Sequence, residues 1–238
     1  MTGSGSDSFD VEIGGVKVCE KWDVNLVGIV IGMPEPVIVT VEIPGYSETA
    51  DLSEVLTGDI QYNERTIQIT FNAECQINEW HSLVSDMANH IHGRRQKVIL
   101  DTDPGYYYIG RLTLDTQLTS QYTSQIVITG TVDPFKYELT SGMEDWLWDP
   151  FNFETDVIRE YKDIQVDGAA EVIIPGLRKR VVPVIYASAA MQVTYNDKSY
   201  SLQAGSNKIY DIALPEGENT LTFTGNGTVS IDYRGGSL

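Results

Sequence analysis

Basic residues are scarce in this chain. It carries 16 lysines and arginines against 34 aspartates and glutamates, a formal net charge of -18 over 238 residues. Proteins that wrap DNA or adsorb to an acidic membrane surface take their affinity from basic patches, so this balance argues against both roles. Apolar runs are short too, and none approaches the roughly 18 residues that a membrane-spanning helix needs. We therefore expect no membrane partner.

Cysteine and histidine are rare and poorly placed for metal binding. Cys19 and Cys75 could pair only with each other. The first ten residues lack the basic and apolar regions of a secretory signal, which favours two reduced, half-buried thiols over a disulfide. His90 and His92 lie about 200° apart around a helix, and His81 lies about 180° from His90. Neither pair can share a metal ion, so the sequence predicts no metal and no other cofactor.

Catalytic signatures are missing as well. The nearest approach to a Gly-x-Ser-x-Gly elbow is Gly3-Ser4-Gly5-Ser6, which is typical of a flexible tail. No phosphate-binding loop or dinucleotide fingerprint is present. A carboxylate pair for glycoside hydrolysis cannot be singled out, because with 34 acids some pair always looks plausible. The sequence predicts no catalytic residue, and a glycan-acting enzyme is the least favoured interpretation.

Alternating apolar side chains are abundant, and they predict a mainly β protein. Gly14-Gly15 indicates a two-residue hairpin turn between residues 11–13 and 16–18. Every second residue is apolar in 37–43 and again in 67–71, the pattern of strands with one buried face. The apolar positions are Val37, Val39, Val41 and Ile43 in the first segment and Ile67, Ile69 and Phe71 in the second.

One helix is predicted, from Glu79 to His92. Asn78 is a suitable N-cap, and Gly93 suits the position after the last turn. Large apolar residues recur at helical spacing, so we expect this stripe to pack on a sheet. The stripe consists of Trp80, Leu83, Val84, Met87 and Ile91.

The segment 99–138 predicts a turn and two strands. Asp103-Pro104-Gly105 indicates a type II turn, with Gly105 at positive φ. Strands should run from about residue 106 to 115 and from 124 to 132, the second with Ile126 and Ile128 on its buried face. The first of these strands opens with three tyrosines, Tyr106, Tyr107 and Tyr108, and continues through Gly110-Arg111-Leu112.

The rest of the chain predicts a second β domain. Short apolar runs at 172–174, 181–185, 192–195, 208–212, 221–223 and 229–231 are separated by turn residues such as Asn196-Asp197 and Gly205-Ser206-Asn207. This spacing is typical of a sandwich of jelly-roll or galectin type. The predicted fold is two β-sandwich domains, residues 1–137 with one packed helix and residues 138–238.

Several of these motifs occur together in one known family. Ile43-Pro44-Gly45 leads through an acidic stretch to Tyr62-Asn63-Glu64-Arg65; a tyrosine-rich Gly-Arg strand then ends in Asp133-Pro134-Phe135-Lys136-Tyr137. Near the far end lie residues 214–221 and Tyr233-Arg234-Gly235-Gly236. In this order, the motifs resemble the distal tail proteins of long-tailed phages of Gram-positive bacteria. The resemblance implies a non-enzymatic hub at the virion tail tip, assembled in the host bacterial cytoplasm.

The resemblance also implies partners. A homohexameric ring, built mainly from the first domain, would join the tail-tube protein to tail-associated or fibre proteins, with the tape-measure protein nearby. DNA would only pass through the central channel. We expect that channel to be lined by acidic and neutral polar side chains, with Arg94, Arg95 and Lys97 kept off it or paired, because unpaired bases would hold phosphates back.

The aromatic residues allow two interpretations. Tryptophan and tyrosine are enriched at protein interfaces, which favours core or interface anchors. The alternative is a carbohydrate-binding sandwich, in which Trp146, Trp148, Phe151 and Phe153, or residues 106–108, would stack on sugar rings. Arg111 should face the tyrosine side of its strand and make a stacked or bidentate contact. The candidate anchors are Tyr106, Tyr107, Tyr108, Arg111, Phe135, Tyr137, Trp146 and Trp148.

Overall fold

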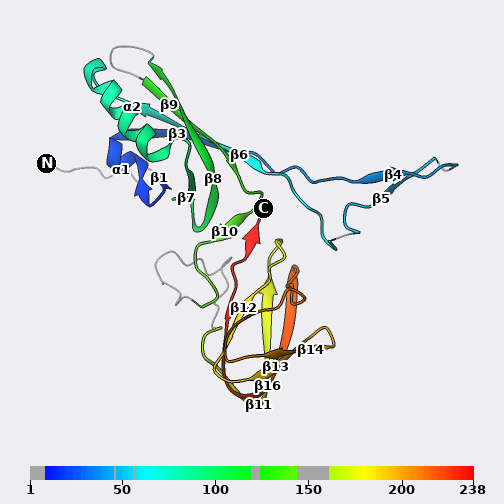
Figure 1. Ribbon diagram of the computed structural model, residues 1–238. Helices are drawn as coiled ribbons and strands as arrows, with labels where there is room; N and C mark the ends of the chain where they lie inside the picture. Colours follow the sequence, from blue (N-terminus) through cyan, green and yellow to red (C-terminus); the bar gives the residue numbers. More distant parts are fainter. Residues whose placement is uncertain (1–8, 46, 56, 119–123, 144–160) are drawn as a thin grey trace. The chain divides into compact units, whose positions relative to one another are not determined.

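Strands build both halves of the chain (Figure 1). The computed structural model describes residues 9–45, 47–55, 57–118, 124–143 and 161–238. These residues divide between unit 1, Met1–Lys136 with Leu238, and unit 2, Tyr137–Ser237. The sequence places this division one residue later, between 137 and 138. The strand β10 (Lys136–Glu138) spans it.

Unit 1 contains one large antiparallel sheet with the strand order β2-β1-β7-β8-β9-β6-β3. Its central strands β6 and β9 pair over their whole length, with Ile69 opposite Ile128. The strands are β1 (Val11–Ile13), β2 (Val16–Lys17), β3 (Val24–Ile31), β6 (Arg65–Ala73), β7 (Arg95–Leu100), β8 (Asp103–Leu118) and β9 (Ser124–Val132). The predicted alternation is confirmed: Ile67, Ile69, Phe71, Ile126, Ile128 and Val132 are all fully buried.

The predicted helix is α2 (Ile77–Ile91), and it packs its apolar stripe on this buried face. Trp80, Met87 and Ile91 are buried, and Leu83 and Val84 pack partly buried against the same core. Asn78 is not the N-cap. The carbonyl of Gln76 accepts the backbone N–H groups of Glu79 and Trp80, so the helix starts before Asn78.

Gly93 follows the helix at φ 74°, as its sequence position predicts.

The turn before β8 differs from the prediction. Asp101 and Thr102 form it, and Asp103 already pairs with Leu100 inside the sheet. Gly105 therefore lies in a strand and not at positive φ. The register shifts between Val98 and Leu100, which pair with Tyr108 and Asp103, so Pro104 and Gly105 lie in the irregular part of this pairing.

The N-terminal hairpin forms as predicted, with Gly14 and Gly15 at φ 60° and 83° between β1 and β2. The strand after the turn is shorter than expected. Val18 begins a short helix, α1 (Val18–Trp22). The carboxylate of Asp10 accepts hydrogen bonds from the backbone N–H groups of Cys19 and Glu20, which stabilises this helical turn locally.

Residues 32–64, between β3 and β6, form a projecting hairpin that we call the arm (Figure 1). It contains β4 (Thr40–Glu42) and β5 (Thr49–Asp51), which pair only with each other. Backbone hydrogen bonds continue toward the sheet, from Val37 to Gln61 and from Asn63 to Glu35, both at 2.8 Å. The arm is therefore a two-stranded extension of unit 1, and turns within residues 53–55 and 57–59 interrupt its second limb.

Unit 2 is built on a long antiparallel pair, β11 (Ile164–Gly176) with β16 (Gly217–Asp232). Glycines at positive φ lie in the middle of this pair: Gly168 stands opposite Gly225, and Gly227 follows. A side chain would not fit at Gly225 or Gly227. A Cβ on Gly225 would lie 2.7 Å from Met191, and one on Gly227 would lie 2.5 Å from Ser188 Oγ.

The two ends of this pair carry different partners around one core. The first half of β16 pairs with β13 (Met191–Tyr195), and β13 pairs in turn with β14 (Lys198–Leu202). The last residues of β16 pair with β12 (Val184–Ala187), and β12 pairs in turn with β15 (Gly205–Lys208). Ile185, Val193, Phe223 and Ile231 are buried together.

Three details of the second half were predicted wrongly. The short runs at 221–223 and 229–231 are parts of one strand, β16, and no turn separates them. Gly205-Ser206-Asn207 is the strand β15 and not a turn, whereas residues 209–212 leave the sheet. The amide of Asn207 donates to the carbonyls of Ile185 and Gln203, and so takes part in the sheet. The turn at Asn196-Asp197 is as predicted, with both residues at positive φ.

The end of unit 2 is fastened to its start. The guanidinium Nη1 of Arg234 donates to the carbonyls of Glu138 and Leu139 at 2.9 and 2.5 Å. The buried carboxylate of Glu138 accepts the backbone N–H of Gly235 at 2.8 Å. Arg234 and Gly235 thus attach the chain to residues 138 and 139 just before the short strand β17 (Gly236–Ser237).

Met87 provides a test of the helix packing. Met87→Asp places a carboxylate at a fully buried position with nothing to pair it, so we expect unit 1 to lose about 3–5 kcal/mol of unfolding free energy or to fail to fold. Met87→Leu keeps the volume and should lose less than about 1.5 kcal/mol. Urea unfolding of both variants measures this; equal stabilities would show that the stripe does not pack as described.

Candidate assembly site

The arm exposes an unusual amount of apolar surface. Every residue from 35 to 45 is exposed, including the face that alternation predicted to be apolar: Val37, Val39, Val41 and Ile43 are 37–48% accessible. Further large side chains are more accessible still: Met33 at 79%, Ile38 at 65% and Val55 at 68%. An isolated two-stranded hairpin is marginally stable in water, so this surface is expected to be covered by something else.

Charge on the arm has one sign. Residues 32–64 contain no lysine or arginine. Within the hairpin, the register places Thr40 opposite Asp51 and Glu42 opposite Thr49, so Glu42 and Asp51 share one face. The acids of the arm are Glu35, Glu42, Glu48, Asp51, Glu54, Asp59 and Glu64.

The sheet has a polar face opposite α2. Directly opposed residues of neighbouring strands share this face: Thr66 with Thr131, Gln68 with Thr129, and Thr129 with Thr113. Thr66, Gln68, Thr113 and Thr131 are exposed, and Thr129 is half-buried. Neutral hydroxyl and amide groups therefore dominate the middle of this face.

Each of the three tyrosines carries a cation over its ring. Tyr107 and Tyr108 are buried and Tyr106 is half-buried. Cation–π contacts contribute about 0.5–2 kcal/mol each, more where water is excluded. The distances to the ring centroids are 4.3 Å for Lys136 over Tyr106, 4.3 Å for Lys97 over Tyr107 and 4.8 Å for Arg65 over Tyr108.

Arg65 is the most unusual member of this row. Its side chain is 3% accessible, and Nε and Nη2 have no hydrogen-bond partner among the described residues. Burial lowers the pKa of this guanidinium from its ordinary value, and burial also raises the pKa of the Tyr108 hydroxyl beside it. The stacking on Tyr108 is thus the contact that compensates a buried charge.

The other candidate anchors are dispersed. Arg111 is exposed and donates from Nη1 to the carbonyl of Gly93 at 2.5 Å; this contact is neither stacked nor bidentate. Phe135 is half-buried and meets Tyr62 edge to face at 5.7 Å. Tyr137, in unit 2, lies under Lys179 at 4.3 Å. Trp146 and Trp148 lie outside the described residues.

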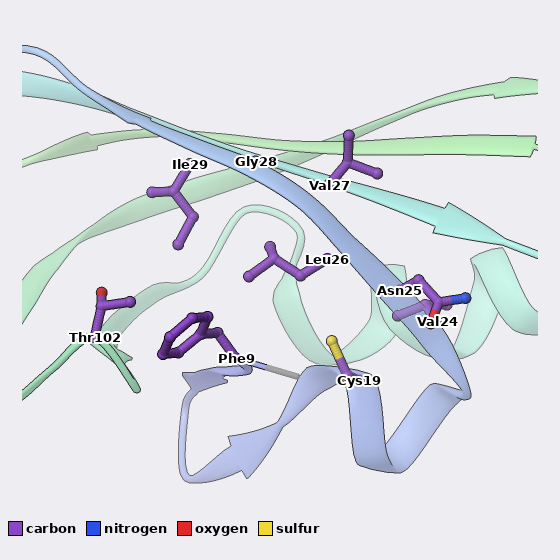
Figure 2. A pocket seen from close by; sticks show the side chains of 9 residues that line it. All are labelled: Phe9, Cys19, Val24, Asn25, Leu26, Val27, Gly28, Ile29 and Thr102. Carbon is purple, nitrogen blue, oxygen red and sulfur yellow. The ribbon is translucent and has the colours of Figure 1, made fainter. Parts of the chain in front are cut away.

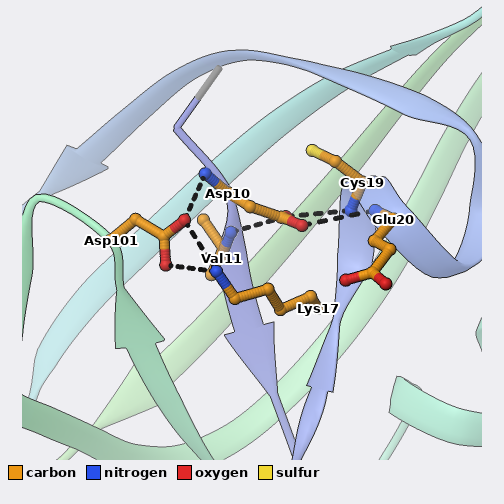
Figure 3. A network of polar contacts seen from close by, with 6 residues as sticks. All are labelled: Asp10, Val11, Lys17, Cys19, Glu20 and Asp101. Carbon is orange, nitrogen blue, oxygen red and sulfur yellow. Dashed lines mark hydrogen bonds and ion pairs between the residues drawn. The ribbon is translucent and has the colours of Figure 1, made fainter. Parts of the chain in front are cut away.

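Asp10 organises a polar network that sequence analysis missed (Figure 3). Its carboxylate accepts backbone N–H groups of Val11 at 2.6 Å and Cys19 at 2.9 Å, while its own N–H donates to Asp101. Burial alone would raise the pKa of Asp10, but these hydrogen bonds outweigh burial and lower it below its ordinary value. Lys17 completes the network through Asp101, at 3.1 Å.

A hollow of about 480 Å³ lies beside this network (Figure 2). Consecutive residues 24–29 of β3 line it, together with Phe9, Cys19 and Thr102. Burial and the nearby Asp10 raise the pKa of the Cys19 thiol to about 12, so it is protonated and unreactive at neutral pH. The hollow offers apolar contact and no chemistry.

The histidines take structural positions. Nε2 of His90 lies 3.2 Å from the carbonyl of Ile13, and Nδ1 of His92 accepts the backbone N–H of Leu114 at 3.1 Å. Across the part of the chain that the structure describes, no group of three or more histidines, cysteines and acids could hold a metal ion. In the same described part, no helix is long and apolar enough to cross a membrane.

These observations define a mainly β protein of two units, with one helix packed on the first sheet and an exposed arm. The crystal structure of SPP1 Dit (gp 19.1), described as a paradigm of the hub adsorption apparatus of phages that infect Gram-positive bacteria, has a similar fold. The TM-score is 0.64 at 11% identity, over 95% of this chain and 98% of that chain. The fold is therefore Dit-like, as the resemblance implied. No family model matches the chain, and no curated protein sequence matches it.

Asp10 gives a pH-dependent prediction. Because its folded pKa is lowered, it contributes stability above its unfolded pKa of about 3.9 and loses it as pH falls through the folded value. Asp10→Asn should therefore lose about 1–3 kcal/mol at pH 7, and the difference from the natural chain should shrink below about pH 4. Urea unfolding over this pH range measures it. Glu74→Gln, which removes an exposed acid, is the control and should show no such convergence.

Arg65 is a buried charged residue whose replacement by an apolar one should cost little stability, in contrast to Asp10. A buried guanidinium with unpaired N–H groups is replaceable by an apolar chain of similar length, so Arg65→Met should leave the unfolding free energy within about 1 kcal/mol or raise it. Arg65→Ala should destabilise by creating a cavity over Tyr108. Denaturant titration separates the two variants. A loss above about 2 kcal/mol in the methionine variant would mean that the guanidinium has a partner in the folded chain.

Proposed function

We propose that this chain is the structural hub of a phage tail tip, in which six copies form a ring that joins the tail tube to the tail-associated or baseplate proteins. The Dit-like fold supports a structural role at the tail tip. The observation that carries the proposal is the exposed arm, because a monomer has no use for a projecting hairpin with large apolar side chains on it.

Burial of the arm is a sufficient driving force for association. Fully burying one large aliphatic side chain contributes about 1.5–3 kcal/mol, and half of that remains available at the exposures seen here. Association of two copies costs roughly 4–15 kcal/mol in lost freedom. The apolar residues of the arm together reach that range. A contact of one copy's arm with a different surface of the next copy is heterologous, and such contacts form a ring when the rotation from copy to copy closes.

The polar sheet face supports a channel. A wall that DNA passes must not bind phosphates, and neutral hydroxyls and amides satisfy that condition. Thr66, Gln68, Thr129 and Thr131 present such groups at the middle of the sheet. Three bases were expected to stay off the channel or to be paired. Arg95 forms an ion pair with Asp133 at 2.6 Å, and Arg94 is exposed. Lys97 lies over Tyr107, on the same face of the sheet as Thr131.

In this role the chain catalyses no reaction, and its partners are other virion proteins. The tail-tube protein, a tail-associated or fibre protein and the tape-measure protein would meet the ring, and it would be assembled in the host cytoplasm. The alternative function is that of a carbohydrate-binding sandwich. Tyr186 and Tyr210 are exposed at 40% and 75% in unit 2, where a sugar ring could stack on them.

The mass in solution tests the proposal. Six copies of the 26.4 kDa chain have a mass of about 158 kDa, and light scattering should find this species at micromolar concentration. A 26.4 kDa monomer that binds polysaccharide would instead support the alternative.

The arm itself is tested by substitution. Val39→Asp with Val41→Asp charges its apolar face, so the assembly should dissociate while unit 1 keeps its unfolding midpoint, because both residues are outside the core. Tyr210→Asp is the control, an equally drastic change at an exposed apolar residue of unit 2. Assembly that persists in the arm variant, or is lost in the control, would show that the arm is not the contact.

A further inference from the structure

Three bases stand together on one face of the sheet in unit 1. Arg95 of β7 lies directly opposite Arg111 of β8, and Lys97 lies opposite Ile109, two positions along the same strands. Strand alternation therefore puts Arg95, Lys97 and Arg111 on one face, and all three are exposed. We call these three residues the basic strip. In a chain with only 16 bases among 238 residues, this is a notable concentration.

The contacts inside the described part of unit 1 hold the strip in place and neutralise one of its three charges, that of Arg95. Arg95 is paired with Asp133, but Arg111 donates to a neutral carbonyl and Lys97 lies over a neutral ring. Like charges directly opposite each other across two strands are destabilising. An additional carboxylate from outside unit 1 would therefore be bound favourably.

The same chain contains a matching acidic surface. The arm has seven acids and no base, and Glu42 and Asp51 share one face of its hairpin. Ser53 donates to the carboxylate of Asp51 from its hydroxyl and its backbone N–H, at 2.5 and 2.9 Å. These bonds lower the pKa of Asp51, so it stays ionised in mildly acidic solution.

Topology separates the two surfaces within one copy. The arm leaves the sheet between β3 and β6, at one edge, whereas the strip is on β7 and β8, beyond β9. One limb of the arm, residues 32–45, spans up to roughly 40 Å at 3.3 Å per residue. A domain of this size has a radius of gyration of about 14 Å. The arm is thus long enough to reach a neighbouring copy.

We propose that the basic strip is the docking surface for the acidic face of the arm of the next copy, with Glu42 and Asp51 meeting Lys97, Arg111 and Arg95. The proposal rests on the ring of the proposed function and assigns its electrostatic contact. It makes the contact heterologous, since donor and acceptor lie at different places of the same unit. It also covers the bases that would otherwise lie near passing DNA.

A charge exchange in the full-length chain tests this pairing. The strip-reversed variant is Lys97→Glu with Arg111→Glu, and the arm-reversed variant is Glu42→Lys with Asp51→Lys. Each places like charges together, so each should raise the dissociation constant of the assembly about ten-fold or more. The variant with all four changes restores opposite charges in every copy, and its dissociation constant should return to within about three-fold of the natural one. Increasing salt should weaken the natural assembly over the range where the Debye length falls below about 8 Å.

The control is Lys21→Glu with Lys198→Glu, which changes the net charge as the strip-reversed variant does, at two exposed lysines outside the strip. It should assemble like the natural chain. The inference is overturned if the strip-reversed variant assembles normally, or if the four-fold variant fails to recover while the natural chain forms rings. A natural chain that stays monomeric at all concentrations would instead overturn the proposed function, and the two failures are therefore distinguishable.

Discussion

The two-residue period of the strands in unit 1 is the constraint on which the rest of the structure depends. Inward side chains of β6 and β9 meet α2 in a core without accessible surface, and their neighbours in sequence are sent to the opposite face. A slip of one residue would exchange the two faces completely. Close strand approach holds this register: a Cβ on Gly110 would lie 2.1 Å from the carbonyl of Thr131, and one on Gly130 would lie 2.4 Å from Leu112.

The arm departs from this arrangement in a consistent way. Its strands alternate as regularly as those of the sheet, but no second layer covers the apolar side. The apolar residues of this hairpin are not part of the buried core of unit 1. A separate, uncovered apolar hairpin on a folded chain is a surface suited to contacts with other molecules.

The large negative charge of the chain also constrains its structure. Six copies would carry a formal charge of about -108, which opposes assembly unless acids are screened by water or meet bases. Most acids are at exposed positions where salt screens them within about 8 Å. Where a carboxylate is buried, as at Asp10 and Glu138, backbone N–H groups satisfy it. Solvent screening and backbone hydrogen bonds thereby lower the electrostatic repulsion among the acids.

The sequence by itself determined what depends on neighbours along the chain. Alternation located β6 and β9, helical spacing located α2 and its stripe, and Gly14-Gly15 and Gly93 marked a turn and a helix end, because these signals are local. It misplaced the turn before β8 and the strand β15, where pairing with another strand or a side-chain hydrogen bond competes with local preference. It also placed the start of α2 two residues late, because the carbonyl of Gln76 accepts the backbone N–H groups of Glu79 and Trp80. One signal for the arm was available, since residues 32–64 combine alternation, acids and prolines without a single base.

Only the tertiary structure decided which apolar face would be covered. Val39 and Ile69 stand in equally regular patterns, yet the first is 48% accessible and the second is fully buried. The difference arises because β6 lies between β9 and β3, under a helix, whereas β4 has one neighbour and no layer above it. Likewise, the stacking of Arg65 on Tyr108 and the hydrogen bond from Asp10 to Asp101 join residues that are distant in sequence. Such contacts follow from how strands are ordered in a sheet, which no local pattern specifies.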